Sequence, residues 1–384
     1  MRIAMMAPLY ESVPPSCYGG TERVVWWLAE ELLRRGHHVT LFATGDSRCS
    51  AELVPVVERA LRTASKGTLI DPIALHLAAA RMARARADEF DLIHSHIDFI
   101  GFPAFDRSPV PVVTTMHGRL DIEGLTEIHR SYRSPVVSIS DSQRAPLPAA
   151  NWVGTVYHGL PMDLYSFGEG RGDYVLFLGR ISPEKAPDVA IRVARRAGIR
   201  LVIAAKVDAA DRTYFETVVE PLLRDGDGVE YIGEVGDQRK IELLRDARAL
   251  LFPVCWPEPF GLVMIEAMAC GAPVVARRFG SVPEVVRGGR TGFICDDEDE
   301  LVAALGRLDE IDRRDCRRWV EDRFSVTRMA ADYEALYRRL IAQRQPVSLH
   351  HRHLDVAVAP ENVDRDLASA IATEIEIKGT GTDA

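Results

Sequence analysis

Several features that define other classes of protein are missing from this chain of 384 residues. It has no run of 18 apolar residues, so we expect no membrane-spanning helix. The six cysteines are scattered and form no Cys-x-x-Cys pair, which indicates free thiols in a reducing compartment. Residues 1–8 are too short for the apolar part of a secretory leader and are typical of a buried strand. These absences predict a cytoplasmic protein.

Positive charge is also in short supply. The 47 Lys and Arg residues are outnumbered by 56 Asp and Glu residues, which gives a formal net charge of −9. Proteins that bind nucleic acids gain affinity by neutralising phosphates with basic side chains, so we expect no nucleic-acid partner. The same charge disfavours anionic membrane surfaces. Peripheral membrane contact is therefore not indicated, although an exposed apolar patch on the first domain would still permit it.

What the chain does contain is an alternation of short apolar runs with segments of helical periodicity. Strands that alternate with helices predict an α/β fold, in which parallel sheets are covered by helices on both faces. Because the alternation restarts after a break, we predict two doubly wound parallel-sheet domains. The expected strands are residues 3–7, 39–43, 92–94, 112–115, 136–139, 155–157, 174–178, 201–204, 229–232, 249–252, 274–276 and 292–294.

The break in this alternation predicts the domain boundaries. Residues 161–173 include a proline and three glycines and have no periodicity, which is typical of a linker. The linker separates an N-terminal domain, residues 1–160, from a C-terminal domain, residues 174–325. A last helix is expected within residues 326–345. The polar residues 346–384 are expected to form a disordered tail.

Two glutamates eight positions apart are the most informative pair in the sequence. Glu258 lies in a Trp-Pro-Glu-Pro turn, and Glu266 lies inside the apolar helix that follows. Carboxylates accept pairs of hydrogen bonds from sugar hydroxyls, and a helix N-terminus suits a phosphate. A loop glutamate is usually solvated, but the flanking prolines fix the backbone of Glu258, and an unpaired Glu266 would be costly to bury. The pair predicts a nucleotide-sugar site.

A basic pair, Arg180 and Lys185, follows the first strand of the second domain. Arg180 offers a planar fork for phosphate oxygens, and Lys185 offers a mobile point charge. Because α/β sheets bind ligands at the carboxyl ends of their strands, these residues are placed to hold a diphosphate and to stabilise its charge as it departs. The alternative is a surface ion pair for Arg180 and a solvated Lys185. If the strand ends of both domains face each other, the cleft between them is the active site.

Gly19 and Gly20 precede a helix predicted over residues 21–35. Glycine lets the backbone approach a ligand closely, and the helix start offers N–H donors. The alternative is a flexible loop with a helix cap. The spacing differs from the G-x-G-x-x-G fingerprint, which argues against a dinucleotide-dependent dehydrogenase and makes Asp46 a turn residue rather than a ribose-binding acid.

Several histidines follow predicted strands. His117 is placed to hydrogen-bond a substrate hydroxyl or to help with proton transfer, the alternative being a buried, satisfied histidine. His94 and His96 lie two positions apart on a strand, which would allow two metal ligands. No third ligand is evident nearby, so no metal site is expected. His158 either lines the cleft or forms a hinge turn. Trp256 is interpreted as a core residue, the alternative being a wall of the cleft.

Residues 258–266 resemble the E-x7-E motif of retaining glycosyltransferases with the GT-B fold, in the large family numbered four. The resemblance covers roughly residues 1–343. It also includes segments 19–23, 179–185, 246–249 and 323–325. Two positions depart from the family pattern: Ala186 stands where glycine is common, and His158 where asparagine is common. Neither departure removes a catalytic group.

This resemblance implies two Rossmann-like domains that face each other across a cleft. It implies transfer of a hexose from a nucleotide diphosphate sugar, expected to be a UDP-hexose, to an unidentified acceptor, with retention and without a metal or other cofactor. A sugar-nucleotide epimerase and a nucleotide-sugar-binding protein without turnover are the alternatives. The implied catalytic residues are Glu258, Arg180, Lys185 and His117. The implied donor-binding residues are Gly19, Gly20, Arg180, Lys185, Glu258, Phe260, Gly261, Leu262 and Glu266.

Overall fold

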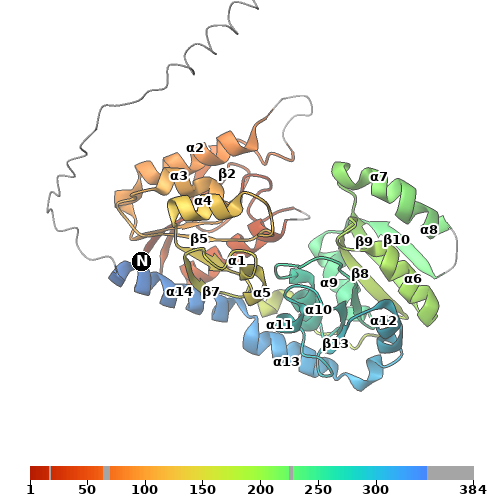
Figure 1. Cartoon of the computed structure of the whole chain (residues 1–384). Helices are drawn as coiled ribbons and strands as arrows, with labels where there is room; N and C mark the ends of the chain where they lie inside the picture. The colour runs from red at the N-terminus through yellow and green to blue at the C-terminus, as the bar shows by residue number, and fades with distance from the viewer. Residues whose placement is uncertain (17–18, 64–69, 225–227, 344–384) are drawn as a thin grey trace, which may run out of the picture. The chain divides into compact units, whose positions relative to one another are not determined.

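Two sheets, each built only of parallel strands, are covered by helices in the computed structural model (Figure 1). The structure describes residues 1–16, 19–63, 70–224 and 228–343. Residues 1–344 form one unit by their contacts, and this unit holds both sheets. The tail expected at residues 346–384 lies outside the described residues.

The first sheet has seven strands in the order β3-β2-β1-β4-β5-β6-β7. All neighbouring strands run parallel. The strands are β1 (Arg2–Met6), β2 (His38–Thr44), β3 (Glu52–Val57), β4 (Leu92–Ser95), β5 (Val112–Thr115), β6 (Val136–Ser138) and β7 (Trp152–Thr155). The helices are α1 (Gly20–Arg34), α2 (Pro72–Ala85), α3 (Phe102–Phe105), α4 (Leu125–Tyr132) and α5 (Asp141–Arg144). Short 3-10 turns lie at Ala87–Glu89, Asp98–Gly101 and Met162–Leu164.

The second sheet has six parallel strands in the order β10-β9-β8-β11-β12-β13. Its strands are β8 (Tyr174–Arg180), β9 (Arg200–Lys206), β10 (Val229–Gly233), β11 (Leu250–Phe252), β12 (Val274–Arg277) and β13 (Gly292–Cys295). The helices are α6 (Pro187–Ala197), α7 (Arg212–Tyr214), α8 (Glu220–Arg224), α9 (Asp237–Asp246), α10 (Leu262–Ala269), α11 (Val282–Val285), α12 (Glu298–Leu305) and α13 (Arg313–Arg323). The last helix, α14 (Val326–Gln343), follows α13 and packs against α1 beside the first sheet. Short 3-10 turns lie at Ala209–Asp211 and Leu308–Glu310, and a π-helical turn, Phe215–Val219, joins α7 to α8.

The strand order reverses once in each sheet. In the first sheet the reversal lies between β1 and β4, and in the second it lies between β8 and β11. The connections on the two sides of such a point run to opposite faces, which leaves a crevice at the carboxyl ends of the strands. The predicted α/β class with two doubly wound parallel sheets is confirmed.

Two details of the strand prediction are wrong. The edge strand β3 was not expected, because it includes Pro55 and pairs on one side only, with β2, where a missing N–H is tolerated. The strand expected at residues 155–157 ends earlier, as β7. Its register against β6 shifts between Val136 and Val137.

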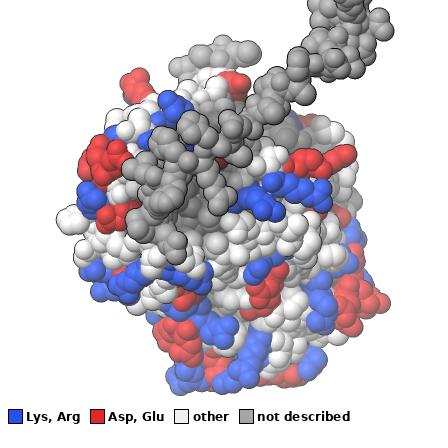
Figure 2. All heavy atoms as spheres, turned by 60° about the vertical axis from the view of Figure 1, so that its left-hand side comes forward, with Lys and Arg blue, Asp and Glu red and all other residues white. Residues whose placement is uncertain are grey.

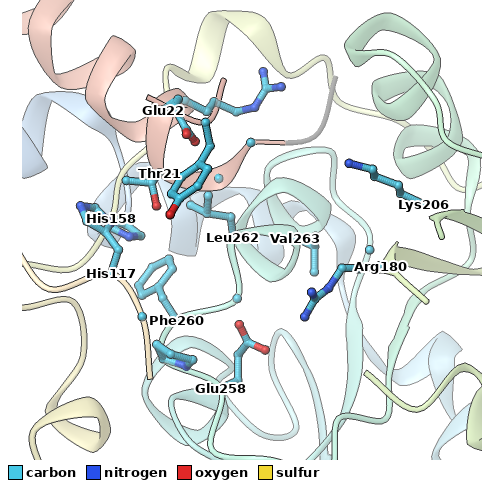
Figure 3. A pocket seen from close by; sticks show the side chains of 18 of the residues that line it. Thr21, Glu22, His117, His158, Arg180, Lys206, Glu258, Phe260, Leu262 and Val263 are labelled. Atoms are coloured by element: carbon cyan, nitrogen blue, oxygen red, sulfur yellow. The ribbon is translucent and has the colours of Figure 1, made fainter. Parts of the chain in front are cut away.

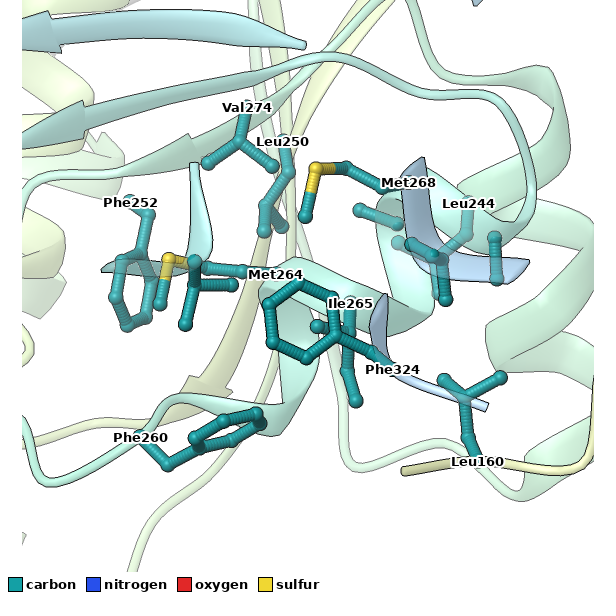
Figure 4. Packing of buried hydrophobic residues seen from close by; sticks show 14 of the residues in the cluster. Leu160, Leu244, Leu250, Phe252, Phe260, Met264, Ile265, Met268, Val274 and Phe324 are labelled. Atoms are coloured by element: carbon teal, nitrogen blue, oxygen red, sulfur yellow. The ribbon is translucent and has the colours of Figure 1, made fainter. Parts of the chain in front are cut away.

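A buried cluster around α10 fixes the loop that precedes this helix (Figure 4). Met264 and Met268 of α10 are buried with Leu250 and Phe252 of β11. Apart from Glu266, the helix is apolar, because it lies between the sheet and α13. Phe260, in the preceding loop, belongs to the same cluster, so the loop is anchored in the core on both sides of Gly261.

The surface and the cysteines agree with the composition. On the face in Figure 2, basic and acidic side chains are interspersed rather than gathered by sign. Within the described ranges, no helix is both long and apolar enough to cross a membrane. The cysteines of those ranges are free thiols, and Cys255 among them is exposed.

Candidate active site

A cavity of about 530 Å³ is lined by residues from both sheets. From the first sheet come residues that follow β1, β4, β5 and β6. From the second come residues at or after the ends of β8, β9, β10 and β11. The cavity therefore lies at the carboxyl ends of the strands, where this architecture places ligands. It takes in all the residues singled out from the sequence as site candidates, namely Gly19, Gly20, His117, Arg180, Lys185, Glu258, Phe260, Gly261, Leu262 and Glu266.

The two sides of the cavity differ in chemistry (Figure 3). In this view His117, His158 and Phe260 lie on one side, and Arg180 and Lys206 lie on the other. The carboxylate of Glu258 points into the space between them. One side therefore offers aromatic rings and the other offers cations.

Glu258 is buried, and two side chains hold its carboxylate. The indole N–H of Trp256 donates to its Oε2 over 3.0 Å, and the ammonium of Lys185 forms a close ion pair with the same oxygen. Lys185 also lies over the rings of Phe252 and Trp256, at 5.6 and 5.4 Å from their centroids. Trp256 lines the cavity and also packs against the core. Lys185 is not solvated, because it is mostly buried in its ion pair with Glu258.

The turn that carries Glu258 is fixed by close backbone packing. Gly280 has a φ of +54°, and a Cβ at this position would lie 2.3 Å from the backbone N and O of Glu258. Ser281 donates its N–H to the Glu258 carbonyl over 3.0 Å. Cys255 donates its backbone N–H to the carbonyl of Glu184 over 3.0 Å, which ties this loop to the loop that carries Lys185. The two loops are therefore held together by backbone contacts.

Arg180 lies among carboxylates that the sequence did not indicate. Its Nη1 is 3.8 Å from Asp208 and 3.7 Å from Asp211, and Asp208 also pairs with Lys206 over 3.0 Å. Lys206 is the register partner of Arg180 on the neighbouring strand. Arg180 Nε and Asp211 Oδ2 are buried without a hydrogen bond. Burial raises the pKa of Asp211 above its usual value, although Arg180 opposes the rise. The charged groups around Arg180 are therefore not all joined by hydrogen bonds.

Glu266 is buried and paired. Tyr165 donates its hydroxyl to Oε1 over 2.8 Å, and Lys240 donates its ammonium over 2.7 Å. Burial alone would raise the pKa of Glu266, but Lys240 and Arg23 hold it below its ordinary value. Arg23 of α1 in turn forms an ion pair with Asp237 of α9 over 2.6 Å. The predicted need of Glu266 for donors is met by these side chains, which left no local signal in the sequence.

Three imidazoles line the opposite side. His96 Nδ1 and His117 Nε2 are 2.8 Å apart, and the ring of His158 stacks on His117 at 5.3 Å and meets Phe260 edge-on at 4.8 Å. Burial lowers the pKa of His117 to about 3 and lowers those of His96 and His158 well below the ordinary value near 6.5. The rings are therefore neutral at pH 7. His158 lines the cavity, so the position where asparagine is common in the family carries an uncharged ring.

Two carboxyl groups stand beside these rings. Asp98 accepts the backbone N–H of His117 over 3.0 Å and has a left-handed φ of 48°. Burial raises its pKa to about 6. Glu22, in the first turn of α1, lines the cavity, and burial raises its pKa to about 7. Neither residue had a distinct sequence signal, because Glu22 follows the glycine pair on a helix and Asp98 lies on a short turn.

Two residues weighed from the sequence lie elsewhere. His94 bonds to Thr115 Oγ1 over 2.8 Å and to the hydroxyl of Tyr337 on α14 over 2.6 Å, so it joins the last helix to the first sheet. Asp46 accepts hydrogen bonds from Thr44 and from the backbone of Ala60, as the turn interpretation expects. Among the residues that the structure describes, no three His, Cys, Asp or Glu side chains are grouped to hold a metal ion.

The comparisons with known proteins agree with this arrangement. Residues 168–322 match the family model described as Glycosyl transferases group 1, and residues 18–153 match Glycosyltransferase Family 4. A D-inositol 3-phosphate glycosyltransferase from Mycolicibacterium smegmatis is 29% identical over 330 residues, which cover 73% of this chain and 76% of that protein.

Solved structures agree as well. AviGT4, a glycosyltransferase involved in avilamycin A biosynthesis, matches with a TM-score of 0.67 at 25% identity, over 89% of this chain and 98% of that chain. Sucrose-phosphate synthase from Thermosynechococcus elongatus has the same fold, with a TM-score of 0.74 at 20% identity, over 89% and 100% of the two chains. The chain belongs to the family 4 glycosyltransferases of GT-B fold, as the resemblance of its motifs indicated.

Proposed function

We propose that this glycosyltransferase moves a hexose from a nucleotide diphosphate sugar, a UDP-hexose, to an acceptor held on the first-sheet side of the cavity. We also propose that transfer proceeds with retention at the anomeric carbon and without a metal. One observation carries the proposal: Arg180, Lys185 and Lys206 line one side of the cavity, and neutral histidines line the other. A diphosphate fits the cationic side, and a sugar fits the space between the two.

The leaving diphosphate needs compensation for its negative charge. Arg180 and Lys185 supply cations, and the first residues of α10, Leu262 and Val263, line the cavity where the helix offers unpaired N–H groups. Because charge builds up on the diphosphate as the bond to the sugar breaks, these groups stabilise the transition state more than the ground state. They perform the task for which other transferases use a divalent cation, and this supports metal independence.

The carboxylates orient the donor. Glu258 accepts hydrogen bonds from sugar hydroxyls once Lys185 turns from it to the diphosphate, and Glu266 accepts from the ribose. The bond from the anomeric carbon to the diphosphate oxygen breaks, and its electron pair goes to the diphosphate. The acceptor oxygen bonds to that carbon on the same face, and its proton passes to a diphosphate oxygen. His117, being neutral, hydrogen-bonds a sugar hydroxyl.

The names of the relatives support a small hydroxylated acceptor. Several are D-inositol 3-phosphate glycosyltransferases at 27–29% identity. That identity leaves room for a different acceptor.

A thermal-shift panel tests the donor site. UDP, GDP, ADP, UDP-glucose, GDP-mannose and NAD are added with magnesium and with EDTA. A ligand that binds only the folded state raises the Tm by mass action. We expect UDP and UDP-glucose to raise the Tm equally in both conditions and NAD to leave it unchanged. Stabilisation that requires magnesium would contradict metal independence, and stabilisation by GDP or ADP alone would contradict the UDP donor.

Lys185→Ala tests the diphosphate site by calorimetry. Because a charge-assisted hydrogen bond is lost, we expect UDP affinity to fall roughly 10- to 100-fold. Arg196→Ala, on the exposed surface of α6, removes one positive charge elsewhere and serves as the control. Equal affinity in the Lys185 variant and the control would remove Lys185 from the site. Production of free epimerised nucleotide sugar, without transfer, would support an epimerase instead.

A further inference from the structure

We infer that the acceptor is a small uncharged or cationic molecule, rich in O–H or N–H groups, that carries no phosphate or carboxylate. The inference rests on the proposed function, because it takes the first-sheet side of the cavity as the place of the acceptor. It is carried by the charges and hydrogen-bonding groups on that side.

The acidic side chains that face this space are Glu22 and Asp98; burial raises their pKa values to about 7 and about 6, so both are negatively charged at pH 8. Glu22 is buried in the first turn of α1, and Figure 3 shows its carboxylate on the same side of the cavity as His117 and His158. Asp98 lines the cavity beside His117, whose backbone it holds. An anionic group placed here would meet two carboxyl groups in a poorly hydrated space, where like charges repel strongly.

The cations of this side are already engaged. Within the described residues it has two, Arg23 and Arg62. Arg23 is buried and paired with Asp237 over 2.6 Å, and Arg62 is paired with Glu11 over 3.0 Å. Each guanidinium already has a carboxylate of its own, so an anionic acceptor would have to break an ion pair to gain a cation.

The histidines do not supply the missing positive charge. His76 donates from Nδ1 to the Pro72 carbonyl over 2.6 Å and accepts the Leu9 N–H at Nε2 over 2.9 Å, which requires a neutral ring. Its pKa is lowered by burial. Burial lowers the pKa values of His96 and His117 more strongly. Within the described ranges, this side of the cavity therefore offers no unengaged positive charge.

The hydrogen-bonding groups on this side are the carboxyl groups and the neutral imidazoles. His96 Nε2 and His158 Nδ1 are buried without a hydrogen-bond partner, so neither nitrogen is exposed to the cavity. The carboxylates accept O–H and N–H groups, so hydroxyls or amines suit this side. Tyr10, Ile100 and Ile139 add apolar wall, which also disfavours a dianion.

This chemistry differs from that named for the relatives. Their acceptor, D-inositol 3-phosphate, carries a phosphate. A protein that holds such a group usually supplies a cation for it, and the two guanidinium groups on this side are paired with Glu11 and Asp237. We therefore place the repulsion of an acceptor phosphate at Glu22 and Asp98.

The test uses acceptor pairs that differ by one phosphate. With UDP-glucose as donor, kcat/KM for transfer is measured for myo-inositol and myo-inositol 1-phosphate, glucose and glucose 6-phosphate, and glycerol and glycerol 3-phosphate. Glucosamine and a set of uncharged aromatic alcohols complete the panel. Release of UDP by hydrolysis without an acceptor is recorded in parallel. We expect the uncharged member of a pair to be favoured roughly tenfold or more, and glucosamine to be accepted at least as well as glucose.

Glu22→Gln removes the charge at constant size. We expect it to shrink the preference for the uncharged member, because repulsion of the phosphate is lost. Asp98→Asn is a second variant that keeps the oxygen bonded to His117, and asparagine tolerates the left-handed backbone at this position. Glu30→Gln, on α1 but outside the cavity, removes one charge as the matched control and should leave the preference unchanged.

Each outcome is decisive. A phosphorylated member preferred over its partner, or a preference unaltered in both the Glu22 and Asp98 variants, overturns the inference. Hydrolysis of UDP-glucose without transfer to any member also overturns it, while the proposed donor function stands. Neither binding nor hydrolysis of any nucleotide sugar would instead be a failure of the proposed function.

Discussion

Glu266 illustrates how single residues are held charged in this site. Its carboxylate is buried, yet its pKa lies below the ordinary value because Lys240 and Arg23 oppose the effect of burial. A carboxyl group with a lowered folded pKa contributes stability above its ordinary pKa of 4.5, and this contribution is lost as the pH falls through the folded value. The contribution depends on the partners remaining in place.

Lys240→Met tests this dependence by urea unfolding. The variant leaves a buried carboxylate without its nearest cation, so we expect a loss of about 3 kcal/mol in the free energy of unfolding at pH 7. At pH 4 the loss should be smaller, because the carboxyl group can then take up a proton. The double variant Lys240→Met with Glu266→Gln should recover most of the loss. An equal loss at both pH values would show that Lys240 acts through packing instead.

At the scale of elements, the turn between β12 and α11 positions the Glu258 loop. Gly280 allows this turn to lie against the backbone of Glu258. A side chain there would displace the loop that carries Glu258, even though Gly280 itself does not line the cavity. The position of this loop therefore depends on an element that follows it in the chain.

Gly280→Ala is expected to lower both stability and donor affinity. The Cβ of the alanine would lie 2.3 Å from the Glu258 backbone, and the alanine would also have to adopt a φ of +54°. Gly289→Ala is the matched control, because Gly289 has a φ of +73° but no atom within 4 Å of its added Cβ. We expect the control to lose about 1–2 kcal/mol and to bind UDP normally. Normal UDP binding in Gly280→Ala would mean that the loop is not set by this contact.

Sequence patterns could predict most elements but not all. Buried strands such as β8 and β12 are short apolar runs, and α14 has a clear helical period, so both kinds were recognisable. β3 was not, because an edge strand with Pro55 and half-exposed residues lacks that apolar run. A short apolar run indicates a buried strand, whereas an edge strand is only partly buried.

The residues of the site likewise include some that the sequence predicts and some that it does not. Glu258, Glu266 and the Arg180 loop are found from sequence because each lies in a local motif at a strand end or a helix start. Lys240 and Asp98 are not found, because the partner that gives each its place lies 26 and 19 residues away in the chain. Contact between distant segments decides these positions, and the sequence carries no local mark of it.

At the scale of the whole molecule, a group of buried neutral histidines joins separate parts of the structure. His94 bonds to α14, His96 and His117 line the cavity, and His158 packs against Phe260 of the second half. Burial lowers the pKa values of all four rings, to about 3 for His94 and His117. Protonation of these rings therefore opposes folding.

This predicts a loss of stability in acid. A histidine whose folded pKa is lowered contributes stability above its unfolded value near 6.5, and this contribution is lost as the pH falls toward the folded value. We expect the free energy of unfolding to fall steadily below pH 6.5, as measured by urea unfolding between pH 8 and pH 5. His158→Asn should reduce the slope by about one proton, whereas His38→Asn, at an exposed position, should not. An unchanged slope in His158→Asn would show that this ring is not buried neutral.

The exposed thiol of Cys255 is a labelling site close to the loop that carries Glu258. It lies three positions before Glu258, in the segment whose backbone is tied to Glu184. An environment-sensitive fluorophore attached to it would lie beside the loop that carries Lys185, because Cys255 contacts Pro183 and Glu184. Burial raises the pKa of this thiol, so labelling calls for a mildly alkaline buffer. Donor binding and release could then be followed by fluorescence in real time, with the native sequence intact and no radiolabelled sugar.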